Sequence, residues 1–294
     1  DHHKNIKVIV SGSSSFEIKS KFKDSLVGRT VNFEIFNLSF EEFLLFKEYY
    51  FEKEAVFTQK KIDELINLFK EYVLYGGYPK IILTDETEKK EKYLQQIIDT
   101  YVRKDIRDLA EIKDIGKFNK LMEALASQSG NLLNIAELSN TCKLAKPTVE
   151  NYLFILENTY IIKLVRPFHK NIRSELFKTP KVYFYDSGLM QMLWLKGLQK
   201  DIIGNVFETA VFSELIKRYA KGQVMYWRTA DKREIDFVLR LNNEIMPIEA
   251  KLNFAGFHPS AMRYFNEKYQ VKNYKIVGLY GEPKDEYYVY PWML

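Results

Sequence analysis

The feature that most constrains this chain is a pair of stretches near its C-terminal end in which apolar and polar residues alternate. Residues 233–241 and 244–252 each follow the two-residue period of a β-strand, and only Asn242-Asn243 separates them. A two-residue connection predicts a β-hairpin, and it fixes the register because residues at equal distance from the turn must face each other. This register places Asp236 directly opposite Glu249.

Two carboxylates that face each other across neighbouring strands repel, so a cation is expected between them. Asp236 and Glu249 supply the oxygen ligands that Mg²⁺ or Mn²⁺ accepts, and Lys251 follows two residues later on the same side. A helix predicted at 204–219 adds Glu208, which lies in an otherwise apolar stripe. The sequence thus predicts a nuclease-like site in which Glu208, Asp236 and Glu249 hold the metal ion and Lys251 assists hydrolysis.

A purely structural interpretation of the same residues stays open at this point. The hairpin register also places Glu234 opposite Lys251, and these two side chains can form a plain cross-strand ion pair. In that case Asp236 and Glu249 lie on a solvated face, and Glu208 lies at the edge of its apolar stripe.

Residues 126–185 follow the order of a winged helix-turn-helix. Asn134 can cap a first helix, and Pro147 stands where a second helix begins. Strands predicted at 161–165 and 181–185 then form a wing hairpin.

The outer face of this predicted unit is polar and partly basic. The second helix exposes Lys146, Thr148 and Asn151, and the loop between the two strands carries Lys170 and Arg173. These side chains are candidates for contact with nucleic acid, through phosphates or the major groove. Contact with a protein partner through the same surface is the alternative.

Earlier parts of the chain predict a sheet and then a long helical stretch. Residues 6–10 are typical of a buried strand and run into a small polar turn, so we expect a chain that begins within a sheet. Ser39 and Glu42 have the spacing of a capping box, and the pattern stays helical to about 125, with a break at Gly76-Gly77-Tyr78-Pro79. The last third alternates helix and strand.

Composition limits where the chain acts. Its net charge of +5 is a mild basic excess, compatible with nucleic acid. Cys142 is the only cysteine, so no internal disulfide forms, and no apolar run is long enough to cross a bilayer. We expect a cytoplasmic protein with no membrane partner.

Together these motifs resemble a prokaryotic AAA-family ATPase whose C-terminal part carries a winged helix and a restriction-endonuclease-like domain of unknown function. The resemblance spans nearly the whole chain. It rests on ordered segments at 8–14, 26–29, 38–43, 75–79, 101–106, 181–189, 204–208, 226–228, 234–237 and 248–251.

The resemblance implies a mixed α and α/β fold in four regions. These are the truncated end of an AAA-type ATPase core (1–45), a helical region (46–125), the winged helix (126–185) and a restriction-endonuclease-like α/β domain (186–294). It further implies that Ser13 or Ser14 ends an ATPase sensor strand and that Arg29 lies near the nucleotide.

One departure from the family bears on activity. The chain contains no Gly-x-x-x-x-Gly-Lys-Ser/Thr loop and no acidic strand upstream of it, which are the elements that hold phosphates and Mg²⁺. ATP therefore belongs to the complete family protein, and this chain is expected neither to bind nor to hydrolyse it.

The leading hypothesis is an ATPase C-terminal part that acts on nucleic acid through a metal-dependent nuclease-like site. The alternative is a non-catalytic DNA- or protein-binding module of a signalling or assembly ATPase.

Overall fold

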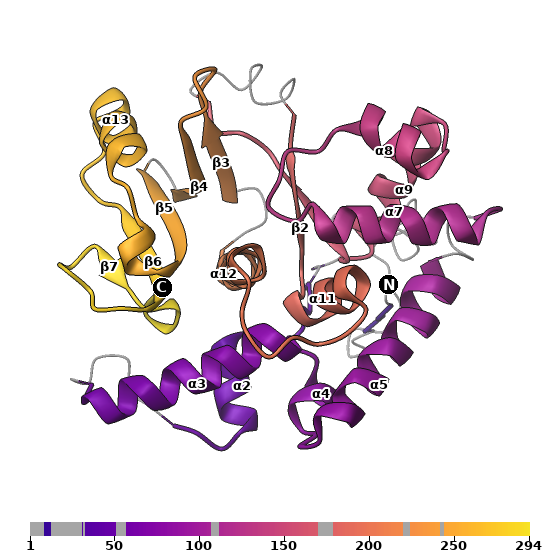
Figure 1. The fold of residues 1–294 in the computed structure, drawn as a ribbon, viewed down its shortest axis with the longest axis horizontal. Helices are drawn as coiled ribbons and strands as arrows, with labels where there is room; N and C mark the ends of the chain where they lie inside the picture. The colour runs from indigo at the N-terminus through magenta and orange to yellow at the C-terminus, as the bar shows by residue number, and fades with distance from the viewer. Residues whose placement is uncertain are drawn as a thin grey trace, which may run out of the picture.

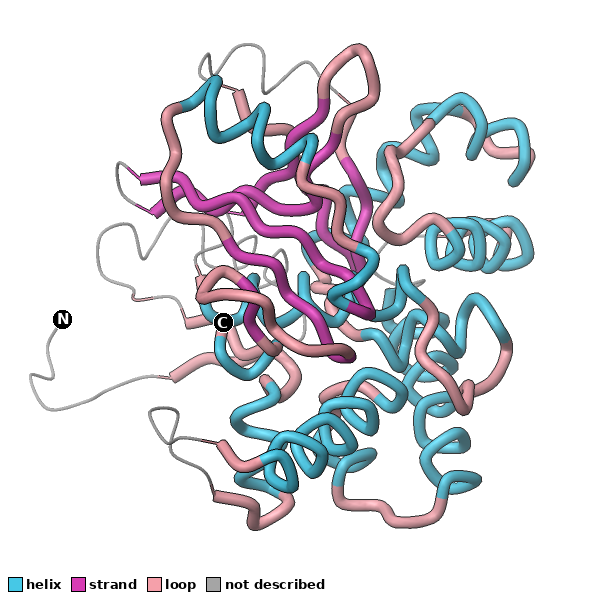
Figure 2. Tube along the Cα trace, turned by 60° about the vertical axis from the view of Figure 1, so that its left-hand side comes forward, coloured by secondary structure: helices cyan, strands magenta, loops and turns pink. Residues whose placement is uncertain are grey.

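The computed structural model describes residues 9–12, 31, 33–50, 57–106, 112–169, 179–219, 224–241 and 244–294. Helices dominate up to residue 158, and the C-terminal part carries a five-stranded sheet (Figure 1). The predicted mixed α and β fold class is confirmed. In Figure 2 the strands gather on one side of the molecule, and most helices lie below and beside them.

The C-terminal sheet has the strand order β3-β4-β5-β6-β7. The first three strands are antiparallel to one another, whereas β6 runs parallel to both β5 and β7. Leu241 pairs with Glu244 and Phe237 with Ile248, so the predicted hairpin register is confirmed for residues 237–241 and 244–248, where the ladder ends. The strands are β3 (Val224–Arg228), β4 (Glu234–Leu241), β5 (Glu244–Asn253), β6 (Lys275–Tyr280) and β7 (Tyr288–Val289).

A helix covers each face of this sheet. Helix α12 (Gly204–Arg218) lies against β5 and is seen nearly end-on in Figure 1. Its Phe212 stacks on Tyr183, with ring centroids 4.7 Å apart. Helix α13 (Ser260–Tyr269) packs on the opposite face, where its Phe265 meets Trp227 edge to face. Because α12 lies between the sheet and the helical part, it is buried on nearly every side.

The middle of the chain is helical, as predicted. The Ser39 hydroxyl accepts from the backbone N–H of Glu42, and the Glu42 carboxylate accepts from the N–H of Ser39, so the capping box is confirmed. The break after α3 occurs at Gly76, whose φ of +81° is readily adopted only by glycine. The elements are α2 (Phe40–Phe46), α3 (Gln59–Tyr75), α4 (Pro79–Ile82), α5 (Thr87–Ile97), the π-helix η1 (Ile98–Asp105), α7 (Ile115–Ser127) and α11 (Ser187–Leu195).

Two short helices and a hairpin follow α7. Asn134 caps α8 by accepting from the backbone N–H of Glu137, and Pro147 lies in the first turn of α9, as predicted. A single bridge from Leu132 to Lys181 adds a third strand position to the hairpin. The elements are α8 (Ile135–Cys142), α9 (Lys146–Asn158) and the antiparallel strands β1 (Ile162–Val165) and β2 (Lys181–Phe184).

The segment that follows β1 joins this hairpin to the C-terminal sheet. The Tyr226 N–H donates to the carbonyl of Arg166 at 3.1 Å, and the Phe168 N–H donates to the carbonyl of Tyr226 at 2.5 Å. The Phe168 ring is buried against Phe265 of α13. This pairing brings β2 close to β3 and β4.

At the N-terminal end, the structure differs from the prediction. Ile9 and Val10 form no strand, and their side chains are 93% and 48% exposed. The predicted buried strand is wrong for these two residues, because no described strand pairs with them and their apolar surface gains no cover. The rest of that strand, Ser13, Ser14 and Arg29 lie outside the described residues.

None of the described helices combines the length and the apolar character that a membrane-spanning helix needs.

Candidate functional site

Strands β4 and β5 bring three predicted site residues together. The Nζ atom of Lys251 lies 2.9 Å from Oδ2 of Asp236 and 2.7 Å from Oε2 of Glu249. The backbone N–H of Ala250 donates to the same Asp236 oxygen at 3.0 Å. We call Asp236, Glu249 and Lys251 the carboxylate–lysine cluster. The Lys251 ammonium group thus lies between the two carboxylates, where a divalent metal ion was predicted.

Burial and mutual charge set the protonation of this cluster. Burial raises the pKa of Glu249 well above its usual value, and the neighbouring charge of Asp236 raises it further. Burial also opposes ionisation of Asp236, but the Lys251 and Lys181 ammonium groups outweigh it and lower the pKa of Asp236. Asp236 therefore favours its charged form and Glu249 its protonated form, and the two carboxylates titrate as a coupled pair.

Glu208 approaches this region from α12. The hydroxyl of Tyr183 donates to Oε1 of Glu208 at 2.5 Å, and Nζ of Lys181 lies 3.7 Å from the same oxygen. Burial raises the pKa of Glu208 to about 7, and the charge of Asp236 adds to the rise. Because one carboxylate perturbs the other, Glu208 belongs to the electrostatic surroundings of the carboxylate–lysine cluster.

Sequence reasoning missed two residues of the site, Lys181 and Tyr183, which both come from β2. The Lys181 side chain is only 3% exposed and lies 2.5 Å from Oε1 of Glu234. Its pKa is raised: burial opposes the charged form, but the charges of Glu208, Asp236 and Glu234 outweigh it. A usable signal existed, because a lysine in a strand that is otherwise apolar must find a buried partner.

The predicted pairing of Glu234 with Lys251 is wrong. Glu234 binds Lys181 and Arg228, the latter at 2.8 Å, and Lys251 binds Asp236 and Glu249 instead. The reason is that Glu234 faces Arg228 across the β3–β4 ladder, a partner that the hairpin alone does not reveal. The solvated-face interpretation is also wrong, since the side chains of Asp236 and Glu249 are 12% and 8% exposed.

The donor set can be compared with the needs of a metal ion. Within the described ranges, no group of three or more His, Cys, Asp and Glu side chains is arranged to hold one. Mg²⁺, however, is commonly held by one or two carboxylates plus water. Asp236 and Glu249 fit that requirement at the position between them that the Lys251 ammonium takes. Glu208 as a third ligand stays a prediction.

The predicted nucleic-acid contacts lie on the outer face of α9. Lys146 and Asn151 are exposed, and Thr148 is half-buried. Lys170 and Arg173 lie outside the described residues. In residues 134–158 the exposed charged side chains are two glutamates and two lysines, namely Glu137, Glu150, Lys143 and Lys146. This face therefore carries no positive excess.

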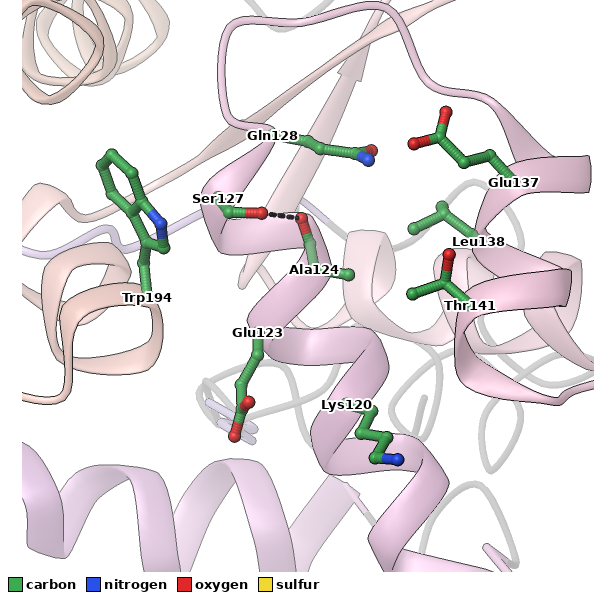
Figure 3. A pocket seen from close by; sticks show the side chains of 9 residues that line it. All are labelled: Lys120, Glu123, Ala124, Ser127, Gln128, Glu137, Leu138, Thr141 and Trp194. Carbon is green, nitrogen blue, oxygen red and sulfur yellow. Dashed lines mark hydrogen bonds between the residues drawn. The ribbon is translucent and has the colours of Figure 1, made fainter.

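An open groove of about 510 Å³ lies between α7 and α8 (Figure 3). Trp194 of α11 closes one end, and none of its lining residues is a predicted site residue. The groove is therefore separate from the carboxylate–lysine cluster.

Comparison with known families covers most of the chain. A family described as an AAA domain matches residues 1–44. Two families described as domains of unknown function match 66–201 (DUF8612) and 203–292 (DUF4143). Residues 1–44 are thus similar to an AAA domain, and most of the remaining chain is similar to the two domains of unknown function. The predicted region boundaries at 45, 125 and 185 stay predictions.

Similar proteins occur in bacteria and archaea. The chain is 28% identical to an uncharacterized protein of Haemophilus influenzae, over 99% of this chain and 71% of that protein. It is 26% identical to the uncharacterized protein MJ1544 of Methanocaldococcus jannaschii, over 84% of this chain and 56% of that protein. It is 25% identical to the uncharacterized protein Rv2008c of Mycobacterium tuberculosis, over 60% of this chain and 42% of that protein. The chain thus spans only part of each of these relatives. No solved structure matches it.

Proposed function

We propose that this chain is the C-terminal part of an AAA-family ATPase that acts on nucleic acid, and that it carries a metal-dependent phosphodiesterase site. One observation carries the proposal. Two buried carboxylates on neighbouring strands share a lysine, and Glu208, with a pKa near 7, lies within their electrostatic reach. Perturbed carboxylates of this kind concentrate at functional sites.

The chain's own residues divide the work. Asp236 and Glu249 would hold Mg²⁺ or Mn²⁺, with Glu208 as a third or water-mediated ligand. The bound ion would supply an activated water and stabilise charge on the phosphoryl group. Glu249 would bind the ion as a carboxylate, and Lys251 would orient the water or neutralise the leaving phosphate.

The arrangement of elements supports action on nucleic acid. The order α7, α8, α9, β1, β2 is that of a winged helix-turn-helix, with the bridge at Leu132 as the additional strand. We propose that nucleic acid is contacted by Lys146, Thr148 and Asn151 on α9 and by Lys170 and Arg173 beyond β1. The mixed sheet between α12 and α13 is compatible with the restriction-endonuclease-like domain that the resemblance implies.

Nucleotide binding is not expected of this chain. Ser13, Ser14 and Arg29 would lie near ATP in the complete family protein, but the phosphate-binding loop is absent from this sequence. Calorimetry with ATP and Mg²⁺ should show no saturable binding. A cytoplasmic location stays a prediction.

A second candidate function is a non-catalytic module that binds DNA or a protein partner. One observation favours it: Lys251 already contacts both Asp236 and Glu249, and Lys181 pairs with Glu234. In this alternative the carboxylates serve the fold alone.

Cleavage assays separate the two functions. The unmodified chain should cleave single- or double-stranded DNA or RNA when Mn²⁺ is added, and Asp236→Asn should abolish cleavage without altering the circular dichroism spectrum. Glu244→Gln, an exposed carboxylate on the same hairpin, is the matched control and should keep full activity. No cleavage of any of these substrates, together with a melting curve indifferent to Mn²⁺, would establish the second candidate instead.

A further inference from the structure

The turn between β3 and β4 and the exposed side of α13 form a basic surface. Residues 229–233 and 258–273 contain five basic and two acidic side chains, all of them exposed. This is a local excess on a chain whose total net charge is only +5. We call this set the basic surface: Lys232, Arg233, Arg263, Lys268 and Lys272, with Asp231 and Glu267 as its acidic members.

Aromatic rings hold two of its cations in place. The guanidinium of Arg233 lies 4.3 Å from the ring centroid of Tyr264, and Nζ of Lys268 lies 5.6 Å from the same centroid. Tyr264 itself rests on Trp227, which is 1% exposed and donates a hydrogen bond to the hydroxyl of Tyr269 at 3.2 Å. Cations fixed on such a platform lose less side-chain entropy when they bind an anion.

The acidic neighbours do not neutralise these cations. Arg233 contacts Asp231 at 3.1 Å, but their side chains are 43% and 62% exposed. An ion pair this exposed contributes little, so Arg233 can exchange it for a stronger ligand. Glu267 is a single charge among three exposed basic residues of α13 and the segment that follows it.

The basic surface leads into the candidate site. Arg233 directly precedes Glu234, which binds Lys181, and Asp236 follows three residues after Arg233. At the rise of a β-strand, this separates the two Cα atoms by about 10 Å. Arg233 rests on α13, whereas the carboxylate–lysine cluster lies near Glu208 of α12 on the other face, so a phosphate chain on Arg233 reaches the cluster around the start of β4, within a few nucleotides.

We propose that the basic surface, and not the α8–α9 face alone, binds the phosphate backbone of nucleic acid and leads it to the carboxylate–lysine cluster. Charge complementarity argues for this ligand, because the described α8–α9 face has equal numbers of exposed basic and acidic side chains. The inference rests on the nucleic-acid part of the proposed function and does not require cleavage.

The test is the salt dependence of DNA binding. A short fluorescein-labelled DNA duplex is titrated with the unmodified chain, with the double variant Arg233→Ala/Lys268→Ala, and with Lys60→Ala/Lys92→Ala as the control. Lys60 and Lys92 are exposed on α3 and α5, which lie at the lower edge of Figure 1, away from α13. Anisotropy is measured over a series of salt concentrations without divalent ions, so that no cleavage occurs.

Loss of two phosphate contacts should weaken binding roughly ten- to hundredfold at low salt and reduce the slope of log K against log salt by about 2. The control should match the unmodified chain in both respects. Unchanged affinity and slope in the Arg233→Ala/Lys268→Ala variant would overturn the inference and leave an acidic protein as the ligand of this surface. Binding that depends on the basic surface in a chain that never cleaves DNA would keep this inference while the phosphodiesterase proposal fails.

Discussion

Replacing Lys251 by methionine removes the cation that two buried carboxylates share. At 2.9 Å and an effective dielectric constant near 20, the attraction between Lys251 and Asp236 is about 6 kcal/mol. The loss of stability is smaller than this attraction for two reasons. Lys251 is 32% exposed, so water screens part of the attraction, and Glu249 is protonated more readily once the ammonium group is gone. Lys251→Met should therefore reduce the free energy of unfolding by about 3 kcal/mol, at the low end for a broken buried pair.

The free energy of unfolding is measured by urea denaturation at neutral pH. Lys163→Met is the matched control: Lys163 lies 2.6 Å from Glu157 with side chains 22% and 27% exposed, but it bridges only one carboxylate. The control should cost about 1 kcal/mol, as expected for a partly exposed pair. The cost of Lys251→Met should also shrink as the pH falls, because protonation of Asp236 removes the charge that Lys251 balances.

Manganese adds a second arm to this experiment. If Asp236 and Glu249 accept a divalent ion, Mn²⁺ should restore the stability of Lys251→Met by about 2.7 kcal/mol at a concentration a hundredfold above its dissociation constant. It should stabilise the unmodified chain less, because the ion must displace the ammonium. The reasoning is refuted if Lys251→Met lowers the free energy of unfolding no more than Lys163→Met does. The metal assignment is refuted if Mn²⁺ stabilises Lys251→Met and the unmodified chain equally.

Three further predictions concern other residues. Folding raises the pKa of Glu208 from 4.5 to about 7, so the stability that its protonated form contributes is present below pH 4.5 and is lost as the pH rises through 7. Between pH 4 and pH 8, the free energy of unfolding of Glu208→Gln should therefore rise by about 3 kcal/mol relative to that of the unmodified chain. Equal pH slopes of the two proteins in urea denaturation would contradict this. Glu214→Ala should cost about 3 kcal/mol in the same assay, because the Glu214 carboxylate accepts from the N–H of Phe40 and the hydroxyl of Tyr72 in a buried setting; a cost below 1 kcal/mol would show that water replaces it. Gly278→Ala should lower the melting temperature through an overpacking cost of about 1–3 kcal/mol, since its new methyl group would meet the Phe254 ring, and an unchanged melting curve would show that the ring can move.

The sequence determined the local structure of this protein wherever one short-range rule decided it. The connection between residues 241 and 244 fixed the register of β4 and β5, because each residue in a hairpin can face only one partner. The capping residues Ser39 and Asn134 predicted where α2 and α8 begin, since their side chains satisfy backbone N–H groups within three residues. These interactions depend only on neighbours along the chain.

Partners distant along the chain were decided by tertiary structure. Lys181 is 53 residues from Glu234, and nothing in either segment states that the hairpin after α9 pairs through Phe168 with β3. Because of that pairing, Glu234 binds Lys181, and Lys251 binds Asp236 and Glu249. It also made the site a joint product of β2, α12 and the β4–β5 hairpin.

The sequence therefore placed Asp236 and Glu249 on neighbouring strands of one hairpin, and the tertiary structure determined which cations neutralise the buried carboxylates. The physical reason is that a buried charge must be paired, while the choice of partner depends on which elements pack together. Asp236 and Glu249 could be placed from a two-residue turn. The hydrogen bond from Tyr183 to Glu208 could not be predicted in this way, because that contact forms only when α12 packs on β2.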